Sequence, residues 1–425
     1  MAAAVPRPDP LAGSATTAIG ASPRRFLLAA FGDAGHAFPM IALGRALVAR
    51  GHEVCMETWP RWSAAVENSG MTYAAAPEYT VFPGPEGAQN PYAAVAGAAR
   101  MSRELVAAWR PEACVHDILT LAPALAAEAE GIPVATLVPH LHPESADGFP
   151  PYALGARLPR TRSGAMLWRR VEPAAARALE QGRRQLNSSR AELGLPPRPY
   201  PHNGLSRELT LVATLPQLEY PRAWPPWTRL TGPLLWEPPS APVDPPPGSG
   251  PVVLVAPSTA QDPQHALLTA ALAGLAGEPV RIVAVCGDPG QRARMRVPDN
   301  AVLVPWLSYA ETMPSCDLVI SHGGHGTLAR ALTSGCPVVV CPAGGDMGEN
   351  AARTDWAGLG VRLPQRLLGP RCLRLAVTRA LGDARLRARA GEVATWSATH
   401  DAGSVASAEL ERWLARRSGT ARAAT

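Results

Sequence analysis

Residues 321 to 332 read SHGGHGTLARAL and follow directly on the apolar residues Leu318, Val319 and Ile320. The apolar run predicts a buried strand and the segment from Thr327 predicts a helix, so three glycines and two histidines fall at the turn between them. Glycines let a backbone approach a ligand closely, and the first N–H groups of a helix lack internal partners, which favours an anion there. This turn predicts a phosphate site, although a tight turn before a capped helix would explain the same letters.

The composition indicates a folded protein rather than a nucleic-acid-binding one. The chain has 425 residues, 47% of them hydrophobic and 18% charged, with a formal net charge of +5. That length favours two domains. The arginines are scattered, and their densest group, Arg412 to Arg422, lies in the tail, so no nucleic-acid partner is expected.

The seven cysteines form no CxxC pair, which favours reduced thiols, a cytoplasmic location and no zinc site. Residues 1–22 are rich in Ala, Gly and Pro and are expected to be a disordered leader. The following run ASPRRFLLAAFG is short for a secretory signal and lacks a convincing cleavage site. Elsewhere no apolar stretch approaches the roughly 20 residues that span a membrane, so no membrane insertion is expected.

Strand and helix patterns alternate from Phe26 onward, which predicts an α/β fold with doubly wound sheets. The first unit is expected as a strand at Phe26 to Phe31, a loop at Gly32 to Ala37 and a helix at Phe38 to Ala49. Prolines crowd the chain between Pro216 and Pro251, after which the alternation restarts. The expected domains are residues 23–232 and 251–400, with a linker at 233–250 and a C-terminal helix and tail at 401–425.

The motifs around the glycine-rich turn are VPWLSYAETMPSCD, from Val304, and CPAGGDMGENAARTDWAGLG, from Cys341. With these motifs the chain resembles family 1 glycosyltransferases of the GT-B fold, especially the bacterial branch that decorates macrolide-like natural products. The resemblance spans roughly residues 24 to 416. It implies two Rossmann-like domains facing a cleft, with the last helix, Ser404 to Arg416, crossing back to the first domain.

The resemblance also implies roles for residues of the second domain. Trp306 would stack on the base of a nucleotide, His322 would contact the diphosphate, and Asp346 would hold hydroxyls of the sugar. The donor-binding residues implied in this way are Ser258, Thr259, Trp306, His322, Gly324, His325, Gly326, Thr327, Asp346, Met347 and Asn350. Each has a plainer alternative, since Trp306 could belong to the core and Asp346 could cap a helix.

The first domain is expected to supply the reaction. An acceptor hydroxyl is a poor nucleophile and needs a base that titrates near neutral pH, as histidine does. His36, in GDAGHAFP, matches the base of the family, and Asp117, in VHDILT, matches the carboxylate that orients it. Attack opposite the nucleotide would invert the configuration of the sugar. No DxD motif occurs in the chain, so no metal and no cofactor are expected.

Four residues depart from the commoner motif of the family: Ser258, Tyr309, Arg330 and Met347. The usual glutamate at position 330 holds both ribose hydroxyls, so its absence makes a dTDP-sugar plausible beside a UDP-sugar. Met347 would suit a deoxygenated sugar carbon better than a hydroxyl. The expected acceptor is an apolar natural-product alcohol, bound by aromatic, methionine and histidine side chains: Trp59, Trp62, Met71, Tyr73, Tyr79, Phe82, His140, His142, Phe149 and Tyr152.

Three other functions are alternatives for the same sequence. A GT-B-fold epimerase would bind the same nucleotide sugar, but it would need acidic catalytic residues around the sugar rather than the pair of His36 and Asp117. A non-catalytic auxiliary protein could keep the nucleotide site alone, but the retained His36 and Asp117 argue against it. Transfer to a lipid at a membrane surface would need a basic and apolar patch. A faint candidate is formed by Arg157, Leu158, Arg160, Arg162, Met166, Trp168, Arg169 and Arg170. The expected assembly is a monomer or a homodimer.

Overall fold

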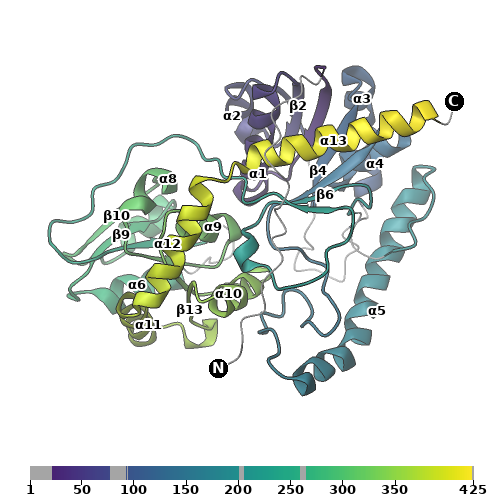
Figure 1. The fold of residues 1–425 in the computed structure, drawn as a ribbon. Helices are drawn as coiled ribbons and strands as arrows, with labels where there is room; N and C mark the ends of the chain where they lie inside the picture. The colour runs from purple at the N-terminus through teal and green to yellow at the C-terminus, as the bar shows by residue number, and fades with distance from the viewer. Residues whose placement is uncertain (1–21, 77–91, 93, 201–204, 259–264, 424–425) are drawn as a thin grey trace.

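A computed structural model describes residues 22–76, 92, 94–200, 205–258 and 265–423, and shows two α/β domains built on separate sheets (Figure 1). Within the described residues the first sheet has seven parallel strands in the order β3-β2-β1-β4-β5-β6-β7. Its strands are β1 (Arg25–Ala29), β2 (Glu53–Thr58), β3 (Thr72–Ala75), β4 (Ala113–Asp117), β5 (Val134–Val138), β6 (Thr210–Val212) and β7 (Thr228–Leu230). The central strands are apolar runs buried on both faces, as parallel sheets between helices require.

The helices of the first domain differ from the sequence expectation in two places. They are α1 (Ala34–Ala49), α2 (Ser63–Glu67), α3 (Val95–Trp109), α4 (Leu121–Ala129) and α5 (Arg162–Glu192), with 3₁₀ turns η1 (Pro60–Trp62) and η2 (Pro216–Leu218). The loop expected at Gly32 to Ala37 is wrong, because the amides of His36 and Ala37 already donate to the Asp33 carbonyl and start the helix. Helix α5 was not anticipated, since it is a mostly exposed and polar segment with Leu186, Ser189 and Arg190 as its buried residues.

The second sheet is also parallel, with the order β10-β9-β8-β11-β12-β13. Its strands are β8 (Val252–Ala256), β9 (Arg281–Val285), β10 (Ala301–Val304), β11 (Leu318–Ser321), β12 (Val338–Val340) and β13 (Gly360–Arg362). Its helices are α6 (Ala266–Leu275), α7 (Pro289–Arg294), α8 (Tyr309–Thr312), α9 (His325–Thr333), α10 (Met347–Trp356), α11 (Pro370–Gly382) and α12 (Ala384–Ala398), with 3₁₀ turns η3 (Met313–Ser315) and η4 (Gln365–Leu367). The two sheets confirm the predicted fold class.

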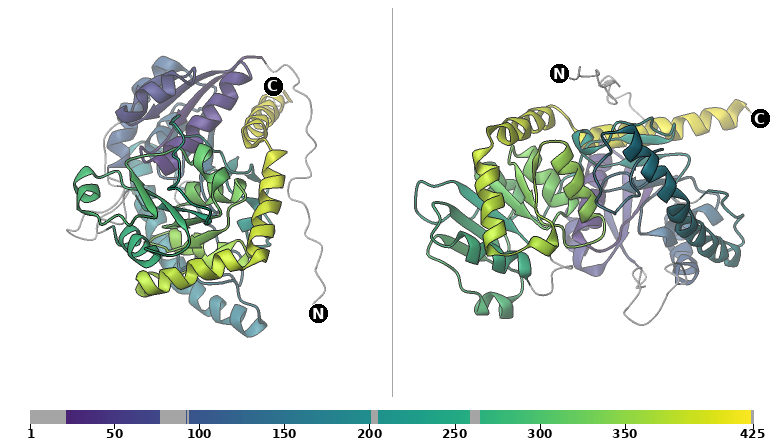
Figure 2. Two further views of the ribbon diagram at one scale, coloured as in Figure 1. Left: turned by 90° about the vertical axis from the view of Figure 1, so that its left-hand side faces the viewer. Right: turned by 90° about the horizontal axis from the view of Figure 1, so that it is seen from below.

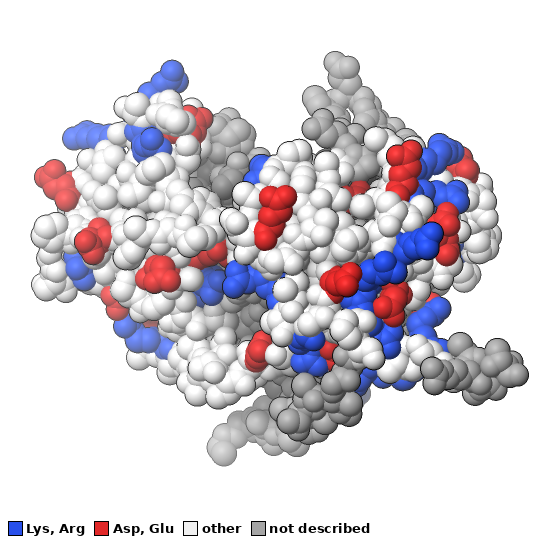
Figure 3. All heavy atoms as spheres, turned by 90° about the horizontal axis from the view of Figure 1, so that it is seen from above, with Lys and Arg blue, Asp and Glu red and all other residues white. Residues whose placement is uncertain are grey.

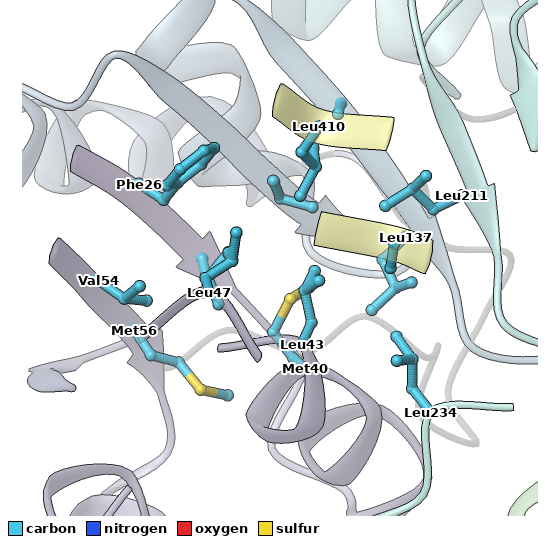
Figure 4. Packing of buried hydrophobic residues seen from close by; sticks show 14 of the residues in the cluster. Phe26, Met40, Leu43, Leu47, Val54, Met56, Leu137, Leu211, Leu234 and Leu410 are labelled. Carbon is cyan, nitrogen blue, oxygen red and sulfur yellow. The ribbon is translucent and has the colours of Figure 1, made fainter. Parts of the chain in front are cut away.

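The last helix, α13 (Ala402–Ala423), leaves the second domain and lies across the first, as expected (Figures 1 and 2). Its buried side chains Leu410, Trp413 and Leu414 belong to the same core as Met40 and Leu47 of α1. Figure 4 shows Leu410 in this core together with Met40 and Leu47. Glu411 adds polar contacts, because it accepts hydrogen bonds from the Arg50 guanidinium at 2.6 and 2.7 Å. The first core is therefore completed by the C-terminal end of the chain.

A buried cluster of charged side chains joins α10 of the second domain to the first domain. Arg353 of α10 pairs with Glu349 at 2.8 Å and with Glu219 of the first domain, and its guanidinium lies over the Tyr220 ring. Nearby, a Cβ on Gly155 would lie 2.8 Å from the Gly348 carbonyl oxygen, so the two backbones touch. The domains are held in contact at the helix that begins beside Asp346.

In the described part of the chain, no helix is long and apolar enough to cross a bilayer. On the face shown in Figure 3, basic and acidic side chains are mixed rather than gathered into areas of one sign.

The crossing helix makes a prediction about stability. Leu410 is fully buried, so Leu410→Ala should lower the free energy of unfolding by about 2–5 kcal/mol, through lost burial and a residual cavity. Urea unfolding followed by circular dichroism measures the change. Leu375→Ala is the control, because that side chain is 59% exposed on α11 and should change stability by no more than about 0.5 kcal/mol. Equal midpoints for the two variants would contradict the packing of α13.

Candidate functional site

The structure brings His36 and Asp117 together. Asp117 is the last residue of β4, and His36 lies in the first turn of α1, which follows β1. Because β1 and β4 are hydrogen-bonded neighbours, the two side chains meet at the carboxyl-terminal ends of these strands. Nδ1 of His36 lies 2.9 Å from Oδ1 of Asp117. The carboxylate is fully buried, while the imidazole keeps 17% of its surface exposed. The pair therefore presents a single imidazole edge outward.

The Asp117 carboxylate is fixed by hydrogen bonds in addition to that with His36. Its Oδ2 accepts from the Phe31 amide and the Thr120 hydroxyl, both at 2.5 Å, and its Oδ1 accepts from the Leu119 amide at 2.8 Å. Burial by itself favours the neutral acid, but His36 and these donors outweigh it and lower the pKa of Asp117. An ionised carboxylate only accepts, so Nδ1 of His36 must carry the proton and Nε2 is left as the free basic nitrogen.

The pKa of His36 is shifted in the direction that suits a base near neutral pH. Burial opposes its protonation, but the Asp117 carboxylate outweighs burial, with further contributions from Asp346 and Asp33, and raises the pKa of His36. His116 beside it differs, since it bonds the Asp117 carbonyl and the Thr136 hydroxyl, each at 2.8 Å, and burial lowers its pKa to about 4. Of these two histidines, His36 is the one that combines partial exposure with a raised pKa.

A second imidazole, that of His140, lies beside His36. The centres of the His36 and His140 rings are 6.3 Å apart and the rings are nearly perpendicular, and the Tyr152 ring stacks on His140 with ring centres 6.2 Å apart. Nδ1 of His140 donates to the Leu141 carbonyl at 2.8 Å, and burial lowers the pKa of His140. The neutral His140 therefore offers Nε2 as a hydrogen-bond acceptor next to the base.

The other residues expected to bind an acceptor fall into three groups. Trp59 and Trp62 flank Gly32 before α1: a Cβ there would meet Trp59 at 1.9 Å, and Trp62 Nε1 donates to the Gly32 carbonyl at 2.7 Å. His142 is a correction, because it is 1% exposed and packs edge-on against Trp224. The remaining positions are Met71 and Tyr73, which pack against the core, Phe149, which meets the Tyr220 ring, and Tyr79 and Phe82, which lie outside the described residues.

The glycine-rich turn is a helix start, as expected. Helix α9 begins at His325 with Gly324 at the preceding position, and Gly323 has φ of 95°, a left-handed conformation that favours glycine. The His322 ring is packed against this turn, since a Cβ on Gly324 would lie 2.4 Å from its Nε2. Nδ1 of His322 donates to the Ala256 carbonyl at 3.2 Å, which leaves Nε2 on the side of the turn.

Three residues around α10 take places that sequence reasoning did not assign. Asn350 is fully buried and its Nδ2 donates to the Gly323 carbonyl at 2.9 Å, so it braces the turn rather than facing a ligand. Met347 is 8% exposed and its Cβ is 3.1 Å from where a Cβ on Gly323 would be. Asp346 remains partly exposed and raises the pKa of His36 across the two domains, after the larger influence of Asp117.

The surface beside α9 contains an aromatic ring and a carboxylate. Trp306 is 47% exposed, so it is available for stacking, whereas Ser258 is buried at the end of β8. Thr259 lies outside the described residues. Glu237 was missed by sequence reasoning, because it comes from the proline-rich linker: its Oε1 accepts from the Ser308 hydroxyl at 2.7 Å. No sequence pattern near Glu237 predicts its contact with Ser308.

Two further features bear on the alternatives. In the described part of the chain, no group of three or more His, Cys, Asp or Glu side chains comes together in a way that could hold a metal ion. The basic segment considered for a lipid surface is partly neutralised, because Arg157 pairs with Asp355 at 2.5 Å and Arg169 with Asp147 at 2.8 Å. Met166, in the same segment, is 52% exposed.

Comparison with known proteins gives consistent similarities. A family model described as "Erythromycin biosynthesis protein CIII-like, C-terminal domain" matches residues 269–407. The 4'-demethylrebeccamycin synthase of Lentzea aerocolonigenes is 30% identical over 89% of this chain and 96% of its own length. The O-mycaminosyltylonolide 6-deoxyallosyltransferase of Streptomyces fradiae is 28% identical over 92% of this chain and 98% of its own length.

Solved structures show the same fold. The glycosyltransferase of kitacinnamycin superposes with a TM-score of 0.73 at 22% identity, over 93% of this chain and 100% of that one. Glycosyltransferase VinC in complex with dTDP superposes with a TM-score of 0.67 at 22% identity, over 92% of this chain and 100% of that one. Both likenesses extend over the two domains.

The site geometry predicts how the imidazole of His36 titrates. Its midpoint should lie above the usual value of about 6.5, and Asp117→Asn should move it below that value, because burial then acts without the opposing carboxylate. NMR titration of histidine-labelled protein measures both. His116 is the internal control and should stay neutral above pH of about 5. A midpoint that is unchanged in Asp117→Asn would contradict the electrostatic pairing.

Proposed function

The chain belongs to the glycosyltransferases of natural-product biosynthesis and has their GT-B fold, and on that premise we propose an inverting, metal-independent sugar transfer with His36 as the base. The donor is a UDP- or dTDP-sugar, and the acceptor is a hydroxyl of an apolar natural product. The observation that carries the proposal is the 2.9 Å contact between Nδ1 of His36 and the buried Asp117 carboxylate. It leaves Nε2 as the nitrogen that takes a proton.

The proposed reaction is a single displacement at the anomeric carbon. Nε2 of His36 takes the proton of the acceptor hydroxyl while its oxygen bonds to the anomeric carbon, and the bond to the diphosphate oxygen breaks. The electron pair of that bond leaves with the nucleoside diphosphate. Asp117 stays ionised and stabilises the imidazolium that forms. Attack from the face opposite the leaving group inverts the sugar.

The start of α9 is the proposed site of the leaving diphosphate. The first amides of a helix point outward without internal partners, and the helix dipole favours negative charge, so His325, Gly326 and Thr327 can stabilise the growing charge. His322 already donates Nδ1–H to a carbonyl, so its Nε2 can donate only as an imidazolium, a charge that a diphosphate would favour. The exposed Trp306 ring is the proposed stacking surface for the base.

A dTDP-linked deoxysugar is the donor that we propose to test first. Arg330 stands where a ribose-binding carboxylate would favour a 2′-hydroxyl, and the apolar Met347 follows Asp346. The name of the Streptomyces fradiae relative specifies a 6-deoxysugar, and VinC was solved with dTDP. Both names support the choice. Asp346 is the side chain proposed to hold the remaining sugar hydroxyls.

The acceptor proposal rests on the surroundings of His36. Phe31 lies edge-on to Trp59 at 4.9 Å and to His36 at 6.1 Å, and Tyr152 stacks on His140. An apolar ring system fits these aromatic faces, while Nε2 of His140 can accept a hydrogen bond from the acceptor. The retained His36 and Asp117 favour this enzyme over a non-catalytic auxiliary protein.

Replacing the base should separate binding from chemistry. His36→Ala should reduce transfer by about 10²–10⁴-fold while the Kd for nucleotide, measured by calorimetry, stays within about twofold. His140→Ala keeps the His36 and Asp117 pair and should retain at least about tenfold more activity than His36→Ala. A fully active His36→Ala variant would remove His36 from its proposed role.

Donor class and metal requirement can be tested in one titration. Calorimetry with dTDP and with UDP, both in excess chelator, should show binding of at least one nucleotide, and dTDP should bind more tightly. Sugar transfer should continue in the same buffer. Activity that is lost in chelator and restored by manganese would contradict the metal-free mechanism, and a strong preference for UDP-glucose would contradict the deoxysugar donor.

A further inference from the structure

Residues 234 to 237 of the linker contact two apolar clusters in turn. Leu234 is buried in the core of the first domain, whereas Leu235 packs against a cluster that contains β8 and β11 of the second domain together with Leu141, Leu215 and Leu218 of the first. Trp236 packs against the first core again, and Glu237 bonds to the second domain. An extended chain between two packed surfaces produces this alternation, because successive side chains point to opposite sides. Residues 234 to 237, which we call the seam, therefore contact both domains.

On the first domain, the seam touches the helix that carries His36. The Trp236 ring meets the Phe38 ring edge-on, with centres 5.1 Å apart and planes at 80°. Phe38 lies in α1, two residues after His36, and also packs edge-on against Trp62 at 5.0 Å. A displacement of Trp236 would therefore act on the first turns of α1.

On the second domain, the seam touches the surface beside Trp306. Oε1 of Glu237 accepts from the Ser308 hydroxyl at 2.7 Å and from the Ala310 amide at 2.5 Å, and so holds the start of α8. The same carboxylate attracts the Arg330 guanidinium, whose pKa is lowered mainly by burial. Glu237 thus fixes the stretch between the exposed Trp306 ring and α9.

We propose that Trp236 and Glu237 are positioning residues that link nucleotide binding on the second domain to the helix of His36. The inference rests on the proposed function, which makes Trp306 and the start of α9 the nucleotide surface. Trp236 and Glu237 are joined by one peptide bond, so α8 cannot shift far without moving the Trp236 ring that packs against Phe38. A bound nucleotide restrains the motion of residues 306 to 310. Because Glu237 is hydrogen-bonded to that stretch and Trp236 packs against Phe38, the motion of α1 is restrained as well. Neither side chain touches the reacting atoms.

Hydrogen exchange with and without saturating dTDP or UDP tests this link without an acceptor. In the wild-type chain, nucleotide should slow amide exchange in α8 and α9 directly, and in α1 by at least about threefold. Trp236→Ala and Glu237→Ala should keep protection of α9 but lose that of α1. Trp236→Phe and Glu237→Gln should retain both, because they keep the ring contact and the accepting oxygen.

Leu235→Ala is the matched control, since it removes apolar packing from the same segment on the opposite side. It should keep the nucleotide-dependent protection of α1. The inference is overturned if α1 is unprotected in the wild-type chain with nucleotide bound, if it stays protected in both alanine variants, or if Leu235→Ala abolishes its protection equally. If neither nucleotide slows exchange in α9 of the wild-type chain, the proposed function itself fails and the link fails with it.

Discussion

The buried carboxylate of Asp117 is the interaction on which the arrangement of the site depends. Burying an ionised carboxylate without partners costs several kcal/mol of free energy, so a buried carboxylate needs hydrogen-bond donors or a cation beside it. They come from three segments: the Phe31 amide after β1, the Leu119 amide and Thr120 hydroxyl before α4, and His36 in α1. The hydrogen bonds to the Asp117 carboxylate therefore fix the positions of the chain after β1, the chain after β4 and the imidazole of His36.

Parallel sheets make that arrangement possible in both domains. All strands of a parallel sheet end on the same side, so the first turns of α1 and α4 meet beside Asp117, and those of α9 and α10 meet beside Gly323. Arg353 and the linker hold the two domains in contact, and α13 completes the first core with residues from the end of the chain. The influence of Asp346 on His36 reflects this proximity.

Sequence reasoning predicted residue positions that follow from strand ends and failed for positions that depend on tertiary packing. His36, Asp117 and the turn at Gly323 lie directly after apolar runs, so their place at sheet edges could be predicted. Burial of His142 and Asn350 could not, because a loop histidine and a helical asparagine look alike whether they face solvent or brace a turn. Glu237 contacts Ser308 from 71 positions away, a pairing that no local pattern encodes.

The proposed reaction is direct displacement of the nucleoside diphosphate by a hydroxyl that His36 deprotonates. The most direct test is the anomeric configuration of the product, read from the ¹H NMR coupling of the transferred sugar after turnover of a donor of known configuration. We expect an α-linked dTDP- or UDP-sugar of the gluco series to give a β-linked product. An α-linked product would contradict single displacement and the role assigned to His36.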